Sequence, residues 1–558
     1  MSLKDVLGKI VGDKPVVLEL DLARGVLVAK PTNPLQAVQL INSPTVAALR
    51  EHLTAAADDE RVLGLIVHAT PTGLQLAHLE EIAELVEQFG TKKTTMAWAE
   101  SFGELVQGLG AYRLAASAQE VWIQPTGMLA IEGVELSITL LKGLLNKVGV
   151  EPQFGQRHEY KTAANTYASD VVTGPHREMM QRIGQSVVDG VVEAIARLRN
   201  LPVDQVWEAV NSSPVEPERA RELGLVDHIG YRDEAYAHAL GEWGADPENL
   251  LFAHRYTSRA ALVRKLRPKQ PKVAVVSLRG AIVTGRGVRT PVGGEQAGAD
   301  VVDEHLRAAL RDDDVKAVVF DVDSPGGSAV ASDFIRRSVL RLREAGKPVV
   351  AHMGAVAASG GYYVAMPSDE IVAQASTLTG SIGVLAGKMV TQRLYDKLGL
   401  VRETIHVGSA AGALSSAHEF TDEDWERLDA WLDRIYLDFT TFAAQDRGMD
   451  YEDLERIARG RVWTGADAKE RGLVDHLGGQ RLAVERACAL AGLNPDTVKL
   501  GHVGDSGLLD LLRPATSSET VAGGAAVADG EQLLAALAAR VGLISRGALS
   551  VPWGLRIS

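Results

Sequence analysis

Short apolar runs alternate with amphipathic stretches along most of the chain. In the second half, VAVVSL (273–278) and AVVFDV (317–322) are β-branched runs typical of buried strands. ADVVDEHLRAALRD, between them, and DFIRRSVLRLREAG (333–346) have apolar residues at helical spacing, and KPVVAHM then indicates another strand. Strands that alternate with helices predict an α/β fold with mostly parallel strands.

The pattern of the first half returns in the second. LGAYRLA (109–115) aligns with SGGYYVA (359–365) at an offset of 250 residues, and GLVDHIG (224–230) aligns with GLVDHLG (472–478) at an offset of 248. A period of this length is too long for a solenoid. The repeat therefore predicts two homologous domains in one chain.

Two shifts in composition mark the expected domain boundaries. A basic segment broken by prolines is typical of a linker, and PATSSETVAGGAAVADG (514–530) is low in complexity. We expect an N-terminal domain over residues 1–254, a linker over 255–272 and a C-terminal domain over 273–505. Residues 506–558 would form a low-complexity segment and a C-terminal helix.

Charge and cysteine content narrow the range of functions. The chain has 58 Lys and Arg against 72 Asp and Glu, a net charge of −14, which disfavours binding to nucleic acid. The single cysteine, Cys488, excludes an internal disulfide and a cysteine-based zinc site, and its context indicates a buried helix position. Because neither HExxH nor a phosphate-binding glycine pattern occurs, we expect no metal, cofactor or nucleotide.

From the sequence we expect no targeting or membrane-spanning segment. Charges throughout residues 1–30 leave no room for an apolar signal region, and the long uncharged stretch 348–368 contains His352 and adjacent glycines. We expect a location in the cytoplasm or at the periphery of the cytoplasmic membrane. EQLLAALAARV (531–541) would dock on the body, on a neighbouring subunit or on a membrane surface.

Three glycine-punctuated turns of the second half carry candidate chemistry. Ser359 follows a predicted strand and precedes two glycines and an apolar run, so free N–H groups could stabilise an oxyanion beside it. In DSPGGS (323–328), Gly327 could supply a second such N–H group, because glycine permits close backbone approach. LTGSIGV (378–384) carries Ser381. Each turn alone is equally compatible with a structural role.

A serine nucleophile needs a base, and the histidines are poor candidates. Asp227-His228 and Asp475-His476 occur in the same context in both halves, although one half lacks the serine, which favours a shared structural role. His352 lies on a predicted strand and is expected to be structural.

Lysine is the other candidate base, because burial can lower its pKa. Lys388 and Lys397 lie in helical stretches, whereas Lys161 lies in a polar segment whose second-half equivalent has no lysine. Ser359 and Ser381, in turn, are replaced by apolar residues in the first half. The first half has the lysine and lacks the serines, and the second half has the serines and lacks the lysine. Two half-sites could therefore form one Ser/Lys site at the domain interface.

SPGGS, AASGGYYVA and TGSIGV, in this order and spacing, resemble the signal peptide peptidase (SppA) family in its long tandem-domain type. The resemblance implies two tandem Clp-protease/crotonase-like domains and peptide hydrolysis by a Ser/Lys dyad. It makes Ser359 the nucleophile, Lys161 the general base and Ser381 the residue that orients the lysine. The N–H groups of Gly327 and Gly360 would form the oxyanion hole.

The same resemblance implies a homotetramer that degrades short or unfolded apolar peptides, such as released signal peptides. Two other functions stay open. A crotonase-like acyl-CoA enzyme would share the architecture but would use glutamates as acid and base. A peptide-binding scaffold would retain the fold without activity. If the nitrogen of Lys161 lay beyond hydrogen-bonding reach of Ser359, the dyad would be excluded.

Overall fold

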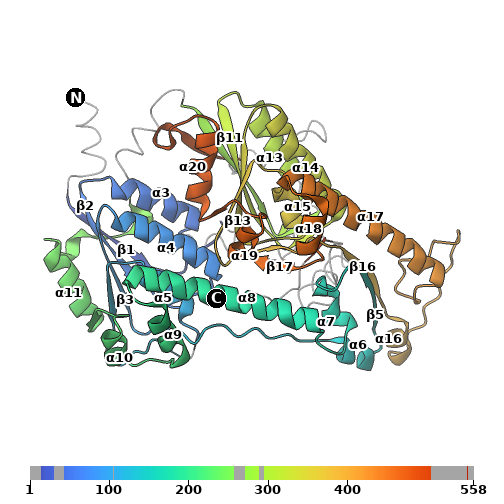
Figure 1. The fold of residues 1–558 in the computed structure, drawn as a ribbon, viewed down its shortest axis with the longest axis horizontal. Helices are drawn as coiled ribbons and strands as arrows, with labels where there is room; N and C mark the ends of the chain where they lie inside the picture. The colour runs from blue at the N-terminus through green and yellow to red at the C-terminus, as the bar shows by residue number, and fades with distance from the viewer. Residues whose placement is uncertain are drawn as a thin grey trace. The chain divides into compact units, whose positions relative to one another are not determined.

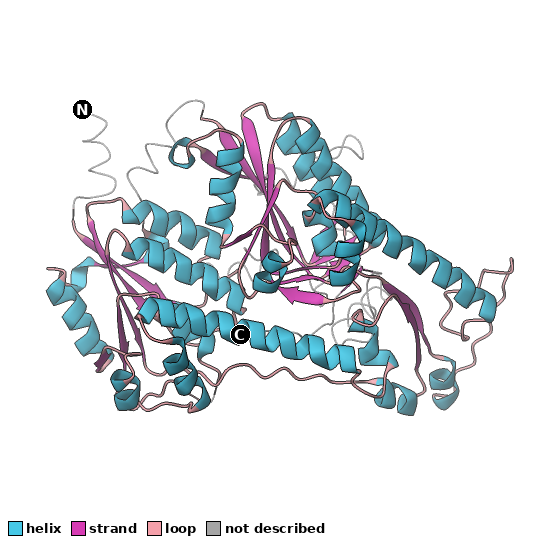
Figure 2. Cartoon of the chain, viewed as in Figure 1, coloured by secondary structure: helices cyan, strands magenta, loops and turns pink. Residues whose placement is uncertain are grey.

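Two sheets of mostly parallel strands, flanked by helices, dominate the structure (Figure 2). It is a computed structural model and describes residues 14–29, 43–104, 106–256, 270–287, 295–503 and 549–550. The chain divides into two compact units. The first comprises the chain up to Glu135 and Val187–Lys269, and the second comprises Leu136–Ser186 and Gln270–Leu555.

The sheet of the first unit has six strands in the order β6-β4-β3-β2-β1-β7, and every neighbouring pair is parallel. Its strands are β1 (Val16–Asp21), β2 (Val62–His68), β3 (Thr94–Ala99), β4 (Glu120–Ile123), β6 (His228–Ile229) and β7 (Leu250–Phe252). Its helices are α3 (Val46–Ala57), α4 (Leu76–Gly90), α5 (Leu109–Ala115), α9 (Val203–Asn211), α10 (Pro217–Glu222) and α11 (Arg232–Glu242).

The sheet of the second unit repeats this order as β18-β14-β13-β11-β8-β19. These strands are β8 (Lys272–Arg279), β11 (Val315–Ser324), β13 (Val349–Ala358), β14 (Glu370–Ala373), β18 (His476–Leu477) and β19 (Lys499–Val503). In addition to β14, β13 pairs with β15 (Leu378–Gly380). β15 in turn pairs antiparallel with β17 (Val462–Thr464). The common strand order confirms the α/β class and the tandem repeat.

The central strands are apolar at successive positions, and successive side chains point to opposite faces, so the sheet is buried on both faces. Val276 and Phe320 belong to one core cluster with α13 (Ala299–Arg311) and α14 (Ala329–Glu344). Val275 and Val319 belong to a second cluster with α20 (Gln480–Leu490), on the opposite face of the sheet (Figure 1). The β-branched runs therefore form the predicted strands, and the lone cysteine is fully buried in α20, as predicted.

Helix α14 begins four residues before the predicted start. Its N-cap is Ser328, the last residue of the DSPGGS motif, whose hydroxyl accepts a hydrogen bond from the N–H of Ala331 at 3.3 Å. Further helices of the second repeat are α15 (Gly360–Ala365), α16 (Gln392–Lys397), α17 (Asp422–Arg447), α18 (Tyr451–Ile457) and α19 (Gly465–Glu470). None of the helices in the described part of the chain has both the length and the apolar character needed to cross a membrane.

A smaller sheet of the second unit carries the two glycines of the DSPGGS motif. Its order is β10-β9-β12-β20. The strands are β9 (Ala281–Val283), β10 (Gln296–Gly298), β12 (Gly326–Gly327) and β20 (Leu549–Ser550). β12 pairs parallel with β9 and antiparallel with β20, so a strand from near the end of the chain lies along the glycines.

The segment Leu136–Ser186 belongs to the first repeat in sequence but to the second compact unit in space. Its elements are α6 (Lys142–Val148), β5 (Glu151–Gln156), α7 (Asn165–Ala168) and the first part of α8 (Gly174–Arg199). β5 pairs antiparallel over its full length with β16 (Leu385–Val390). At the end of β5, Arg157 donates to the Asp429 carboxylate of α17 at 3.1 Å.

These contacts attach the segment that carries Lys161 to β16 and α17 of the second repeat. The site expected at a domain interface therefore lies within one compact unit. Residues 257–269 of the expected linker and the expected helix at 531–541 lie outside the described residues.

Candidate active site

Ser359 lies at the predicted turn between a strand, β13, and a helix, α15. Its backbone has φ 56° and ψ −115°, a conformation that costs a non-glycine residue free energy and recurs at sharp nucleophile turns. The turn is held from both sides: Ser359 donates its N–H to the carbonyl of Gly380 at 2.8 Å, and its own carbonyl accepts from the N–H of Tyr363 at 2.9 Å. The strain is thus imposed by the surrounding backbone.

Lys161 meets both candidate serines. Its Nζ lies 2.7 Å from Ser359 Oγ, 3.0 Å from Ser381 Oγ and 3.0 Å from the Ser381 carbonyl oxygen. All three residues are almost completely buried. The structure therefore brings together the three side chains that the sequence nominated, and the lysine satisfies the distance condition set for a dyad.

Burial is the cause of the unusual acidity of Lys161. Removing an ammonium group from water disfavours its charged form, and this lowers the pKa of Lys161 to about 7. A substantial fraction of the side chain is then neutral near pH 7. In that form the Nζ lone pair can accept the proton of the Ser359 hydroxyl, which an ordinary lysine could not do.

Gly460 supports Lys161 and was missed by the sequence analysis. A Cβ at Gly460 would lie 2.5 Å from the backbone nitrogen of Lys161, and its φ of +80° also favours glycine. The next residue, Arg461, accepts the N–H of Ser381 at 2.7 Å through its carbonyl. One loop therefore packs against the lysine and also holds the second serine.

A signal for Gly460 was present in the repeat. At the offset of 248 residues that relates the two GLVDH motifs, the first half has Ser212 in its place. The comparison that singled out Lys161, as a residue found in one half alone, would also have found this glycine.

Gly327 and Gly360 lie against each other. A Cβ on Gly360 would lie 3.0 Å from the Gly327 nitrogen and 2.8 Å from Ser332 Oγ. A Cβ on Gly327 would lie 2.1 Å from the carbonyl oxygen of Ile282. Neither position has room for a side chain, so the backbones of both expected oxyanion residues approach each other beside Ser359.

The aspartates of the two Asp-His pairs have the shared structural role that was predicted for the pairs. Asp227 accepts the N–H of Val121 at 2.7 Å and pairs with Arg199 at 2.6 Å. Asp475 accepts the N–H of Ile371 at 2.7 Å and pairs with an arginine, Arg447, at 2.7 Å. The same contacts in both repeats fix the edge of each sheet.

The other candidate bases contact different partners. Nδ1 of His352 lies 2.7 Å from Asp321 Oδ1. Lys388 lies in strand β16 and not in the predicted helical stretch, because this segment pairs with β5, and its Nζ donates to the carbonyl of Ala413 at 2.9 Å. Lys397 is exposed on α16, as predicted. Among the lysines and histidines considered as candidate bases, Lys161 is the one whose side chain contacts Ser359.

A buried serine on a strand-to-helix turn, with a lysine nitrogen 2.7 Å from its hydroxyl, is a candidate active site of a serine hydrolase built on α/β layers. The chain belongs to peptidase family S49: the model of this family matches residues 87–244 and 341–494, one segment in each repeat. It is therefore a serine peptidase, and its substrates are peptides. Membership confirms the resemblance seen in the motifs and excludes the acyl-CoA alternative.

Relatives with described activities match most of the chain. It is 31% identical to Serine protease SPPA, chloroplastic, of Arabidopsis thaliana over 487 residues, covering 85% of this chain and 69% of the relative. It is 28% identical to Protease 4 of Haemophilus influenzae, covering 79% and 72%. Among solved structures, it is similar to a ClpP1 variant of Listeria monocytogenes, with a TM-score of 0.24 and 14% identity over 40% of this chain and 98% of that one.

Proposed function

We propose that Ser359 and Lys161 form the catalytic dyad of an endopeptidase that degrades short or unfolded apolar peptides, such as released signal peptides. The observation that carries the proposal is the 2.7 Å contact between Lys161 Nζ and Ser359 Oγ in a site where burial lowers the pKa of the lysine to about 7. The substrate class rests on the resemblance to the SppA family.

In the first half of the reaction, Ser359 Oγ attacks the carbonyl carbon of the scissile peptide bond while its proton passes to Lys161 Nζ. The carbonyl oxygen becomes an oxyanion, which the N–H groups of Gly327 and Gly360 stabilise. Lys161 then gives the proton to the leaving amine. The peptide bond breaks and an ester on Ser359 remains.

In the second half, a water molecule attacks the ester carbon and loses a proton to Lys161. The new oxyanion collapses, the carboxylic acid product leaves, and Ser359 Oγ recovers a proton from the lysine. Ser381 positions the lysine through both its hydroxyl and its carbonyl, so that Nζ stays aimed at Ser359 Oγ during both steps.

The pairing of β12 supports an extended binding mode for the peptide. Gly326 and Gly327 pair antiparallel with Leu549 and Ser550, which shows that the edge of β12 can receive an extended backbone. A substrate bound in this way would take the place of Leu549 and Ser550 along β12, beside Gly327, and its affinity would come mainly from main-chain hydrogen bonds.

Hydrolysis of a fluorogenic apolar peptide by the purified full-length protein tests the dyad. Ser359→Ala and Lys161→Met are each expected to reduce kcat/KM by at least about 1,000-fold, because the members of a dyad act as a unit. Lys388→Met is the matched control, since this lysine is also buried and its pKa is also lowered by desolvation, but its Nζ contacts Ala413.

Retention of activity by Lys161→Met, with folding verified by circular dichroism, would show that another group is the base. If the wild-type protein cleaves none of a panel of apolar peptides, the scaffold alternative would be favoured instead. A panel that contrasts signal-peptide segments with charged peptides of equal length tests the substrate class separately from the dyad.

A further inference from the structure

A group of metal-ligand side chains lies in the first unit, which does not contain the candidate catalytic residues. Glu120 on β4, His228 on β6 and His238 on α11 each direct one ligand atom to a common point, and these atoms lie within 4.8 Å of one another. Within the described residues, it is the one group of three or more such side chains that could hold a metal ion.

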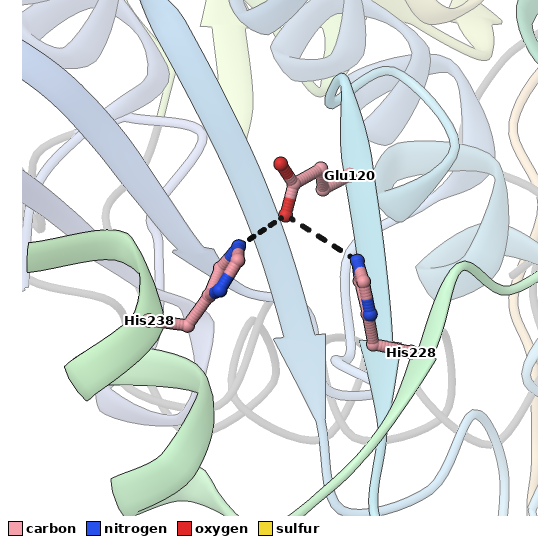
Figure 3. Close-up of side chains that lie close together, drawn as sticks. All are labelled: Glu120, His228 and His238. Atoms are coloured by element: carbon pink, nitrogen blue, oxygen red, sulfur yellow. Dashed lines mark ion pairs between the residues drawn. The ribbon is translucent and has the colours of Figure 1, made fainter. Parts of the chain in front are cut away.

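The ligand atoms lie near the spacing of ligands around one ion, with all three within 4.8 Å of one another. Nε2 of His238 lies 3.2 Å and Nε2 of His228 lies 3.8 Å from the same oxygen, Glu120 Oε2 (Figure 3). Metal–ligand distances near 2.1 Å in a tetrahedral site place two ligand atoms about 3.4 Å apart. Small side-chain rotations would therefore bring all three atoms into contact with one ion.

The core of the unit holds two of the ligands in position. Trp122, which is buried in the cluster that joins the sheet to α11, stacks on the ring of His228 with the centroids 4.4 Å apart. Its centroid lies 5.2 Å from that of His238. All three ligand side chains are 34% to 44% exposed, so a water molecule can reach the open side.

The second repeat provides an internal comparison. Glu370 corresponds to Glu120 at an offset of 250 residues, and His476 corresponds to His228 at 248. The position of His238, however, is taken by Arg486, which binds both oxygens of Glu370 at 2.6 Å. In the second repeat the glutamate is thus paired with an arginine, which cannot bind a metal ion, whereas in the first repeat it faces an imidazole, which can.

We propose that Glu120, His228 and His238 bind a zinc ion, with water as the fourth ligand. Two imidazoles and one carboxylate form a donor set that suits Zn²⁺, and the ion would join β4, β6 and α11. The alternative, an ion pair between Glu120 and protonated histidines, needs no metal. The sequence predicted no metal because the three ligands come from separate elements and form no recognisable motif.

Calorimetric titration of untagged, chelator-treated full-length protein with ZnCl₂ tests the proposal. We expect one equivalent to bind to the wild type and none to His238→Arg, which copies the second repeat and retains a partner for Glu120. His476→Ala and His418→Ala are controls that should keep one equivalent. Zinc should also raise the melting temperature of the wild type but not that of His238→Arg, since it binds the folded state.

Cobalt provides a readout that does not depend on stability. Visible d–d bands of four-coordinate Co²⁺ should appear in the wild type and be absent in His238→Arg. A wild type that binds no zinc, or a His238→Arg variant that still binds one equivalent, would overturn the proposal. Neither result would alter the case for the dyad, which lies in the other unit.

Discussion

Burial makes Lys161 a candidate general base by lowering its pKa. In the described structure, its Nζ contacts two serine hydroxyls and a carbonyl, and no carboxylate is among the causes of its pKa shift. A neighbouring carboxylate would stabilise the ammonium form and raise the pKa, which would remove the base. The site thus depends as much on the absence of a counter-charge among its contacts as on the lysine itself.

The pH dependence of kcat/KM follows from this pKa. The active form has neutral Lys161, so kcat/KM should fall about tenfold for each pH unit below about 7 and level off above it. The sign is opposite to that expected of a mechanism that needs the ammonium form. Initial rates in a constant-ionic-strength buffer series measure it, and Lys388→Met should show the same profile. A flat profile from about pH 5 to 8 would contradict the assignment.

The repeat explains why the three catalytic candidates could be nominated from the sequence. Lys161, Ser359 and Ser381 each occur in one half and have no equivalent in the other, and this contrast separates chemistry from shared fold. Gly460 follows the same rule but carries no reactive group, so residue chemistry gave no reason to examine it. Its importance depends on which backbone lies 2.5 Å away, which a sequence does not record.

At the scale of elements, the loop between α18 and β17 determines where the lysine lies. Gly460→Ala would add a Cβ that overlaps the Lys161 backbone and should lower kcat about 10- to 100-fold, because a displacement near 1 Å has this effect on a positioned group. Peptide hydrolysis at saturating substrate measures it.

Gly448→Ala is the matched control for this change. Gly448 ends α17 with a φ of +62°, and its Cβ would meet nothing within 4 Å. Both substitutions carry the free-energy cost of a left-handed alanine, about 1 kcal/mol, so their losses of stability should share that part. Equal losses of activity in the two variants would show that Gly460 has no specific contact with the site.

Local patterns predicted the elements but not all of their partners. The β-branched runs and amphipathic helices of the second half lie where periodicity placed them, since burial on both faces leaves a continuous apolar signal. β5, with the sequence EPQFGQ, has no such signal. It is a strand because β16 pairs with it, and a pairing over more than 200 residues of sequence cannot be inferred from local periodicity.

At the scale of the whole chain, duplication has allowed the two halves to diverge while their strand order is unchanged. The second repeat has the serines and the Arg486–Glu370 pair, whereas the first has the lysine and the Glu120–His238 pair. The aspartates that fix the sheet edges are the same in both. The two copies therefore share the contacts that hold their sheet edges and differ in the residues of both candidate sites.

An exposed apolar segment in the second unit is a candidate interface for the homotetramer that the family resemblance implies. Between Leu398 and Leu414, the side chains of Val401, Ile405 and Val407 are 98%, 86% and 91% exposed in the single chain. Apolar side chains exposed together in this way mark surfaces that become covered in an assembly. A second copy of this chain is the partner that the family resemblance implies.

Because the family resemblance implies four copies, light scattering after gel filtration should give four times the chain mass of 59.6 kDa for the wild type. Replacing Val401, Ile405 and Val407 together by Asp should reduce this mass, because burying three carboxylates at an interface costs more free energy than the lost apolar contacts return. Val203→Asp, on an exposed position of α9, should leave the mass unchanged. A wild type with the mass of one chain, or a triple variant that keeps the full assembly, would contradict the assignment of this surface.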